Sequence, residues 1–310
     1  MAFLNAFGAY LPERVVTNAE MSALAGCDPD WIFNVSGIEE RRFAAESETV
    51  TDMAVKAAED CLSRTGVTAT ELGLIIVAGG SAERCFPGPA ASVAARLGLE
   101  GTPAIDIPMA SAGTLFGLHL AAQLAATHGN ILVIGAEKMS DVVLRKPREA
   151  GVAALFGDGA GACLVSRDQG RARIVDSLIS SDGAFADDLR LEFEGPLQMN
   201  GRIVILQASR KIPRAISDLL ARNHRAAAEI DVFLMHQANL NLTVRVAQAL
   251  DVPADRFYSN IRRYGNTSSA SMLIAASEWA QGGGFRPGVP VVFAAFGAGF
   301  HWGALLAEGV

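Results

Sequence analysis

The chain has 310 residues, of which half are hydrophobic and 19% charged, and its net charge is −7. This composition indicates a well-packed globular protein, long enough for two domains or for one large α/β unit. The acidic balance and the lack of a basic patch exclude nucleic acid as an expected partner, and no apolar stretch of about 18 residues predicts a membrane span.

Four cysteines occur without the CxxC spacing of metal or redox sites: Cys27, Cys61, Cys85 and Cys163. They predict reduced, mostly buried thiols. The first residues lack the basic and apolar regions of a signal peptide, and we therefore expect a cytoplasmic protein. The histidines show no ligand spacing, so neither a metal nor a cofactor is expected. We interpret the pairs Arg41–Arg42 and Arg262–Arg263 as solvated.

In the first half, short apolar runs alternate with helical stretches. Strands are predicted at 74–78, 130–135 and 161–165, and a helix at 89–97. Residues 104–118 predict a short strand, a tight turn and the start of a helix that is apolar nearly all round. Such a helix is expected to be central and buried.

The second half repeats this rhythm, with strands predicted at 230–235 and 290–294 and helices at 239–250 and 267–280. Continuous apolar strands alternating with helices favour α/β sheets covered on both faces. The polar stretch 166–170 is the expected joint, which gives an N-terminal half of 1–168 and a C-terminal half of 169–310.

Three polar residues follow predicted strands and precede predicted helices: Ser111, His236 and Asn266. In α/β sheets, sites form at such carboxyl ends of strands. A nucleophile at a helix N-terminus benefits from free N–H groups and the helix dipole, although a serine also needs a base. The alternatives are a helix N-cap for Ser111, a core histidine for His236 and a turn residue for Asn266.

Seven segments in this order resemble the 3-oxoacyl-acyl-carrier-protein synthase III family of thiolase-like condensing enzymes. They are residues 8–18, 30–32, 36–42, 156–162, 236–239, 264–268 and 296–303. The resemblance implies a five-layer αβαβα fold built from two similar halves, and a homodimer. It also implies a Cys-His-Asn triad at the bottom of a tunnel, which accepts an acyl group from a coenzyme A or carrier-protein thioester and condenses it with malonyl carrier protein.

His236 and Asn266 match their family positions, but Ser111 stands where the family has its nucleophilic cysteine. By resemblance, Ser111 accepts the acyl group, His236 acts as base and hydrogen-bond donor, and Asn266 is a second donor. The oxyanion hole would use the backbone N–H groups of Ser111 and Ala298. The serine is either natural or the product of an engineered Cys-to-Ser replacement.

The resemblance also assigns an entrance and a docking face. Trp31 matches a residue that stacks on the coenzyme A adenine, and Phe86 one that reaches into the partner's tunnel. Arg148, Arg202, Ile205 and Phe296 complete the expected substrate-binding set. Two family arginines are replaced by Val35 and Ala150, which should weaken coenzyme A binding and favours a carrier-protein donor.

Arg210, Lys211 and Arg214 are the expected carrier-protein docking residues, with a solvated helix face as the alternative. The segment 156–162 lacks the Lys-Ser/Thr of a phosphate loop, and we expect a structural turn in which Asp158 bonds to backbone. The sequence therefore predicts an acyltransferase. The alternatives are a non-catalytic partner subunit of an active paralogue and a thioester hydrolase.

Overall fold

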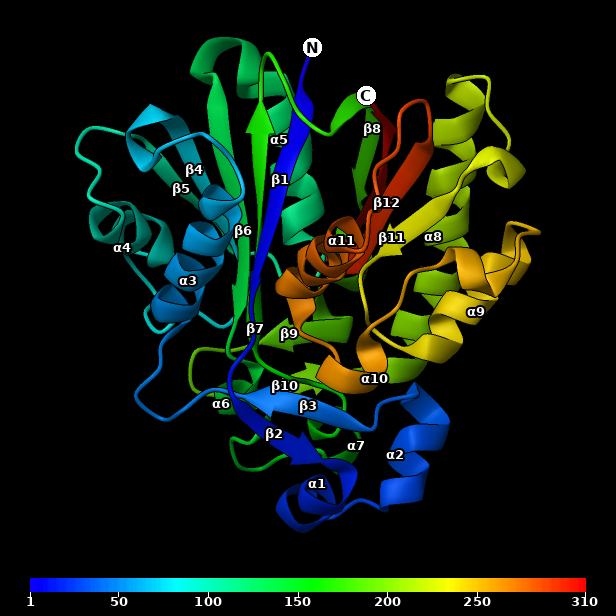
Figure 1. The fold of residues 1–310 in the computed structure, drawn as a ribbon. Coiled ribbons are helices and arrows are strands. Elements are labelled where there is room, and N and C mark those ends of the chain that lie inside the picture. The colour runs from blue at the N-terminus through cyan, green and yellow to red at the C-terminus, as the bar shows by residue number, and fades with distance from the viewer.

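A computed structural model describes all 310 residues, and its N-terminal half is built on five strands (Figure 1). Their spatial order is β5 (Ala104–Ile107), β4 (Leu72–Ala78), β6 (Asn130–Glu137), β7 (Gly159–Ser166) and β1 (Phe3–Tyr10). The first three are parallel, whereas β7 and β1 are each antiparallel to the preceding neighbour. The parallel strands therefore end at one edge of the half-sheet.

The C-terminal half continues the sheet with four strands: β8 (Ala172–Ser181), β13 (His301–Gly309), β12 (Pro290–Gly297) and β11 (Val232–Met235). Strands β11 and β12 are parallel, and the other pairs are antiparallel. The halves join where β1 pairs with β8, and only Phe3 and Leu4 of β1 take part in that pairing. The loop 167–171 connects β7 to β8.

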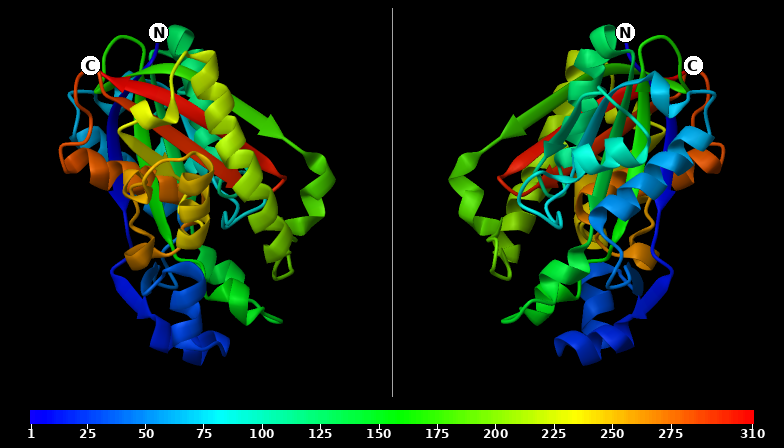
Figure 2. Two further views of the ribbon diagram at one scale, coloured as in Figure 1. Left: turned by 90° about the vertical axis from the view of Figure 1, so that its right-hand side faces the viewer. Right: turned by 90° about the vertical axis from the view of Figure 1, so that its left-hand side faces the viewer.

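Helices form three further layers. Helices α5 (Gly113–His128) and α11 (Ser271–Gln281) contact strands of both halves and lie between them. The outer face of the first half carries α3 (Val50–Ser63) and α4 (Pro89–Arg96), and that of the second half carries α8 (Gly201–Arg222) and α9 (Leu240–Ala249) (Figures 1 and 2). This arrangement confirms the predicted α/β fold with αβαβα layers.

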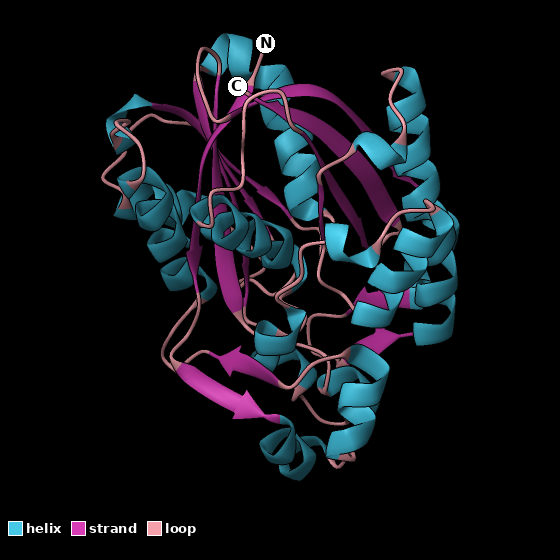
Figure 3. Cartoon of the chain, turned by 45° about the vertical axis from the view of Figure 1, so that its right-hand side comes forward, coloured by secondary structure: helices cyan, strands magenta, loops and turns pink.

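The remaining elements lie mostly beyond the carboxyl ends of the parallel strands (Figure 3). They are β2 (Arg14–Thr17), β3 (Glu40–Phe43), β9 (Leu189–Leu191), β10 (Leu197–Met199), α1 (Asn18–Ala25), α2 (Pro29–Ser36), α6 (Met139–Val143), α7 (Ala150–Ala153) and α10 (Ile261–Tyr264). Short 3₁₀ turns occur at Ala69–Glu71, Gly183–Asp188, Ala227–Glu229, Ala254–Arg256 and Ser268–Ala270. None of the helices combines the length and apolar character that crossing a membrane requires.

Local sequence explains where the helices begin and end. The Asp28 carboxylate caps α2 by accepting from the Trp31 N–H, Pro29 occupies the first turn, and Gly37 ends the helix in the left-handed conformation. Helix α3 begins with a capping box between Thr49 and Asp52. These local signals mark both ends of α2 and the start of α3.

Several expectations need correction. Arg41 is fully buried rather than solvated, and its guanidinium donates to the carbonyls of Val16 and Ala154 and to Asn18 Oδ1. Burial lowers the pKa of Arg41 to about 10. The expectation of mostly buried cysteines holds for Cys61 and Cys163, whereas Cys27 is partly exposed and Cys85 is exposed.

Two predicted helices also differ from the structure. The helix predicted at 267–280 begins as a 3₁₀ turn, and α11 starts only at Ser271. Helix α5 is central, but Phe116, Leu120 and Leu124 on its other face are only partly buried. A helix can therefore be apolar nearly all round without every one of its apolar side chains being fully buried.

Candidate active site

Ser111 occupies the turn between β5 and α5. Its φ is 66°, in the left-handed region that non-glycine residues rarely adopt. Such a conformation costs about 1–3 kcal/mol and is concentrated at functional sites. The N-cap of α5 is Ala112 and makes no side-chain cap bond, so Ser111 is not the N-cap that the alternative reading proposed.

The end of β12 fixes this turn from the opposite half. A Cβ atom on Gly297 would lie 2.1 Å from the Ala110 carbonyl oxygen and 2.6 Å from the Ala112 nitrogen. Only glycine permits this approach. The Ala298 N–H that follows donates to no backbone carbonyl, which leaves it available as the predicted oxyanion donor.

Ser268 is the direct hydrogen-bond partner of Ser111. The Ser111 N–H donates to Ser268 Oγ at 3.0 Å, and the two hydroxyl oxygens are 3.4 Å apart. The Ser111 N–H predicted for the oxyanion hole is therefore engaged by Ser268. Ser268 also has a positive φ, of 47°, and its N–H donates to Asn266 Oδ1 at 2.8 Å. Because that oxygen is engaged, the NH₂ group of Asn266 remains as the free donor.

His236 directly follows β11 and is 4% exposed. Its Nδ1 lies 2.6 Å from Ser271 Oγ, at the start of α11, and this contact fixes the ring. Burial lowers the pKa of His236 to about 4. The imidazole is therefore neutral near pH 7 and retains one donor and one acceptor nitrogen.

Glu137 ends β6 and is fully buried. Its carboxylate accepts from the Gly80 N–H at 3.0 Å, the Ser81 hydroxyl at 2.5 Å and the Ser269 N–H at 3.3 Å. Burial raises the pKa of Glu137, while hydrogen bonding from the Ser81 and Ser268 hydroxyls opposes that rise. No cation pairs with this carboxylate.

The three predicted catalytic residues line one cavity of about 80 Å³. Most of its 17 lining residues are hydrophobic, and they come from both halves of the chain. Two of the predicted substrate-binding residues, Ile205 and Phe296, lie in this lining. The arrangement brings a hydroxyl, an imidazole and an amide together at one mostly apolar space, which suits a site for an acyl chain.

The other predicted substrate-binding residues do not line the cavity. Trp31 is 41% exposed on α2 and Phe86 is 87% exposed. Arg202 is exposed at the start of α8. Arg148 borders a separate open cleft with Asp187 and other polar residues.

The predicted docking residues divide into two groups on α8. Lys211 donates to Asp182 at 2.8 Å, and its ammonium lies 4.0 Å from the centre of the Trp302 ring. Arg210 and Arg214 are exposed, and Arg214 makes only a long ion pair of 3.6 Å with Asp218. Only the two arginines therefore present free charge to a partner.

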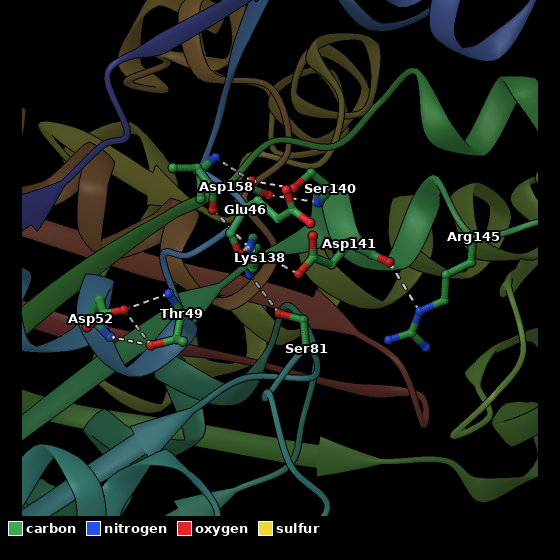
Figure 4. A network of polar contacts seen from close by, with 11 residues as sticks. Glu46, Thr49, Asp52, Ser81, Lys138, Ser140, Asp141, Arg145 and Asp158 are labelled. Carbon is green, nitrogen blue, oxygen red and sulfur yellow. Dashed lines mark hydrogen bonds and ion pairs between the residues drawn. The ribbon is translucent and has the colours of Figure 1, made fainter.

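The loop containing Asp158 is structural, as expected. Its buried carboxylate accepts from the N–H groups of Ala44 and Ser140, each at 2.8 Å, and from the Ser140 hydroxyl at 2.6 Å (Figure 4). Nearby, the Lys138 ammonium donates to the carbonyls of Ala45 and Glu46. This network ties the loop to the segment after β3 and to the start of α6.

Sequence reasoning missed the roles of Ser268, Ser271 and Glu137. Ser268 belongs to the quoted segment 264–268, but nothing in the pattern distinguished it from the other hydroxyl residues there. A carboxylate that ends an apolar strand was the one available signal for Glu137. Ser271 gave none, because its contact with His236 depends on how α11 packs.

Comparisons with known proteins identify the family of this chain. A family model described as 3-oxoacyl-[acyl-carrier-protein] synthase III matches residues 105–183, and its C-terminal counterpart matches residues 220–308. The β-ketoacyl-[acyl-carrier-protein] synthase III of Oleidesulfovibrio alaskensis is 36% identical, with 98% of each chain covered.

Two solved structures have the same overall fold. The synthase III of Aquifex aeolicus superposes with a TM-score of 0.95 at 33% identity, covering 99% of this chain and 100% of that one. The priming β-ketosynthase of the R1128 polyketide pathway superposes with a TM-score of 0.91 at 27% identity, covering 100% and 96%. The chain belongs to the 3-oxoacyl-[acyl-carrier-protein] synthase III family of thiolase-like condensing acyltransferases.

Proposed function

We propose that this protein takes an acyl group from a coenzyme A or carrier-protein thioester onto Ser111. It then passes the group to malonyl carrier protein, with loss of carbon dioxide, or to another nucleophile. The observation that carries this proposal is the meeting of Ser111, His236 and Asn266 at one apolar cavity. The relatives named for synthase III activity and for polyketide priming support a reaction in fatty acid or polyketide-type synthesis.

In this proposal, His236 and Asn266 stabilise the enolate that forms when malonyl carrier protein loses carbon dioxide. A neutral His236 and the free NH₂ group of Asn266 can both donate to one developing oxygen. The cavity volume of about 80 Å³ is small, and a short acyl chain is therefore the proposed substrate.

The proposed donor is a carrier protein rather than free coenzyme A. Val35 and Ala150 carry no charge where phosphate-binding arginines are expected, whereas Arg210 and Arg214 stand exposed one helical turn apart on α8. An acidic carrier protein would meet this pair, and reversing both charges should weaken transfer from a carrier-protein donor more than from coenzyme A. A homodimer remains part of the proposal.

The test is the intact mass of the protein after incubation with acetyl to octanoyl thioesters, with Ser111→Ala as the matched control. We expect the acyl mass on Ser111, mapped by peptide analysis, with short chains preferred. Release of free acid without an adduct would support a hydrolase. No adduct and no turnover with any donor would support a non-catalytic partner subunit, and a label on exposed Cys85 would contradict the assignment of Ser111.

A gain of condensation in Ser111→Cys would fit either a natural serine or a Cys-to-Ser replacement, because the thiolate is favoured at a helix N-terminus. Unchanged rates of acylation and of condensation in this variant would show that the serine does not limit the reaction.

A further inference from the structure

The main chain of Asn266 is held by a segment from the other half of the chain. The Asn266 N–H donates to the Leu155 carbonyl at 2.9 Å, and the Asn266 carbonyl accepts from the Gly157 N–H at 3.0 Å. The side-chain oxygen of Asn266 is engaged by the Ser268 N–H. The place of its free NH₂ group at the cavity therefore depends on the pairing with residues 155–157.

The side chain of Arg41 packs against both partners of this pairing. A Cβ atom on Gly157 would lie 2.9 Å from the Arg41 Cβ, and one on Gly265 would lie 3.3 Å from the same atom. At its other end, the guanidinium donates to the Ala154 carbonyl at 2.7 Å, and Ala154 immediately precedes Leu155. Arg41 thus contacts the paired segments at both ends of its side chain.

The remaining contacts join Arg41 to elements outside the cavity. Its Nη1 donates to Asn18 Oδ1 at 2.8 Å and to the Val16 carbonyl at 3.3 Å, and Asn18 in turn donates to the Ile38 carbonyl at 2.7 Å. The acceptors of the guanidinium include no carboxylate, and its Nε has no hydrogen-bond partner. A buried cation without a counter-ion is costly for folding. Its bonds nevertheless fix where three oxygen atoms from separate segments lie.

We propose that Arg41 is a positioning residue for Asn266, holding the paired segment so that the free NH₂ group of Asn266 meets the enolate oxygen. This inference rests on the proposed function of Asn266. Arg41 does not line the cavity, so it acts only through the pairing. A catalytic group that is misplaced by about 1 Å can lose about 10² in rate. The turn at Ser111 is held by other contacts, from Ser268 and Gly297, and acylation should not depend on Arg41.

A double-mutant cycle tests this role. Arg41→Met is placed in the parent protein and in an Asn266→Ala background. Carbon dioxide release from malonyl carrier protein and adduct formation on Ser111 are both measured per folded molecule. We expect Arg41→Met to slow carbon dioxide release by about 10²-fold in the parent. It should add little in the Asn266→Ala background, because residues that act through one another are not additive. Adduct formation should stay close to the parent rate.

Two further variants support the cycle. Arg41→Lys keeps the charge but loses the guanidinium fork, so we expect an intermediate rate, and it replaces Arg41→Met if that variant does not fold. Arg256→Met is the matched control, because Arg256 also donates to two carbonyls, those of Ala228 and Ile230, and does not line the cavity. It should release carbon dioxide at close to the parent rate.

Three results would overturn the inference. Equal losses in the parent and in the Asn266→Ala background, or a matching loss of adduct formation, would assign Arg41 a general structural role. Parent-like carbon dioxide release in every folded Arg41 variant would overturn the positioning role and leave the proposed function intact. Absence of carbon dioxide release by the parent protein would overturn the decarboxylative reaction itself, and this inference with it.

Discussion

Two buried carboxylates, Asp158 and Glu137, have the same kinds of hydrogen-bond donor, but they lie beside different parts of the molecule. Each is fully buried, each accepts from backbone N–H groups and serine hydroxyls, and burial raises the pKa of each. The Ser140 hydroxyl bonds to Asp158 at 2.6 Å, and neither of these two residues lines the cavity. The Ser268 hydroxyl near Glu137 also contacts the Ser111 hydroxyl, which lines the cavity.

The difference teaches that burial and a perturbed pKa do not by themselves distinguish a structural carboxylate from one at a reactive site. What distinguishes them is the neighbouring residue: the backbone that donates to Glu137 adjoins Ser268, which contacts the cavity-lining Ser111, whereas neither Ser140 nor Ala44 lines the cavity. Three predictions can break or sharpen this comparison.

The largest effect is expected at the cavity itself. His236→Ala and Asn266→Ala should each slow carbon dioxide release from malonyl carrier protein by about 10²–10³, roughly 3–4 kcal/mol, because each removes a donor to the enolate oxygen. The double variant should lose little more than the worse single variant, since the two donors act as a unit. Radiolabelled carbon dioxide release measures the effect.

The same variants should still form the acyl adduct slowly if both side chains serve the enolate rather than the activation of Ser111. Loss of the adduct in His236→Ala alone would make His236 the base. Wild-type rates in both steps would mean that the site is wrongly assigned.

The second prediction concerns the pH dependence of stability at Asp158. Burial raises the pKa of Asp158 to about 6 in the folded protein, against an ordinary value of 3.8. The folded state then binds this proton more tightly than the unfolded state, so the associated stability is present below about pH 4 and is lost as the pH rises through about 6. The total is about 3 kcal/mol.

Urea unfolding between pH 4 and pH 7 measures this change. The free energy of unfolding of the parent minus that of Asp158→Asn should fall as the pH rises. Asp187→Asn, at a side chain that is 90% exposed, is the control and should give a nearly flat difference. Acylation per folded molecule should be unaffected in Asp158→Asn. A slowed acylation rate there would show that Asp158 is not purely structural.

The smallest effect concerns the strained turn at Ser111. Ser111→Gly and Ser111→Ala both remove the hydroxyl, but only glycine adopts a φ of 66° without strain. We expect Ser111→Gly to be the more stable by about 1 kcal/mol in urea unfolding, with the adduct absent from both. Equal stabilities would show that the turn stores no strain at this residue.

Local patterns predicted most elements, because strand and helix signals are set by nearby residues. The strand predicted at 74–78 is β4, and the helix predicted at 89–97 is α4. The prediction for Arg41 was wrong, because an arginine in a polar stretch gives no sign that carbonyls from distant segments will surround it. The start of α11 was misplaced for a related reason, since Ser268 and Ser269 take their conformations from contacts with Ser111 and Glu137.

The sequence by itself determined the α/β fold, the family and the residues Ser111, His236 and Asn266, because strand periodicity and ordered motifs are written along the chain. Only the tertiary structure decided which groups touch them. Ser268 lies 157 residues from Ser111, and Ser269 lies 132 residues from Glu137. These contacts form where α11 packs between the two halves of the sheet. Hydrogen bonds require atoms about 3 Å apart, and only the packing of strands and helices into one core sets such distances between remote residues.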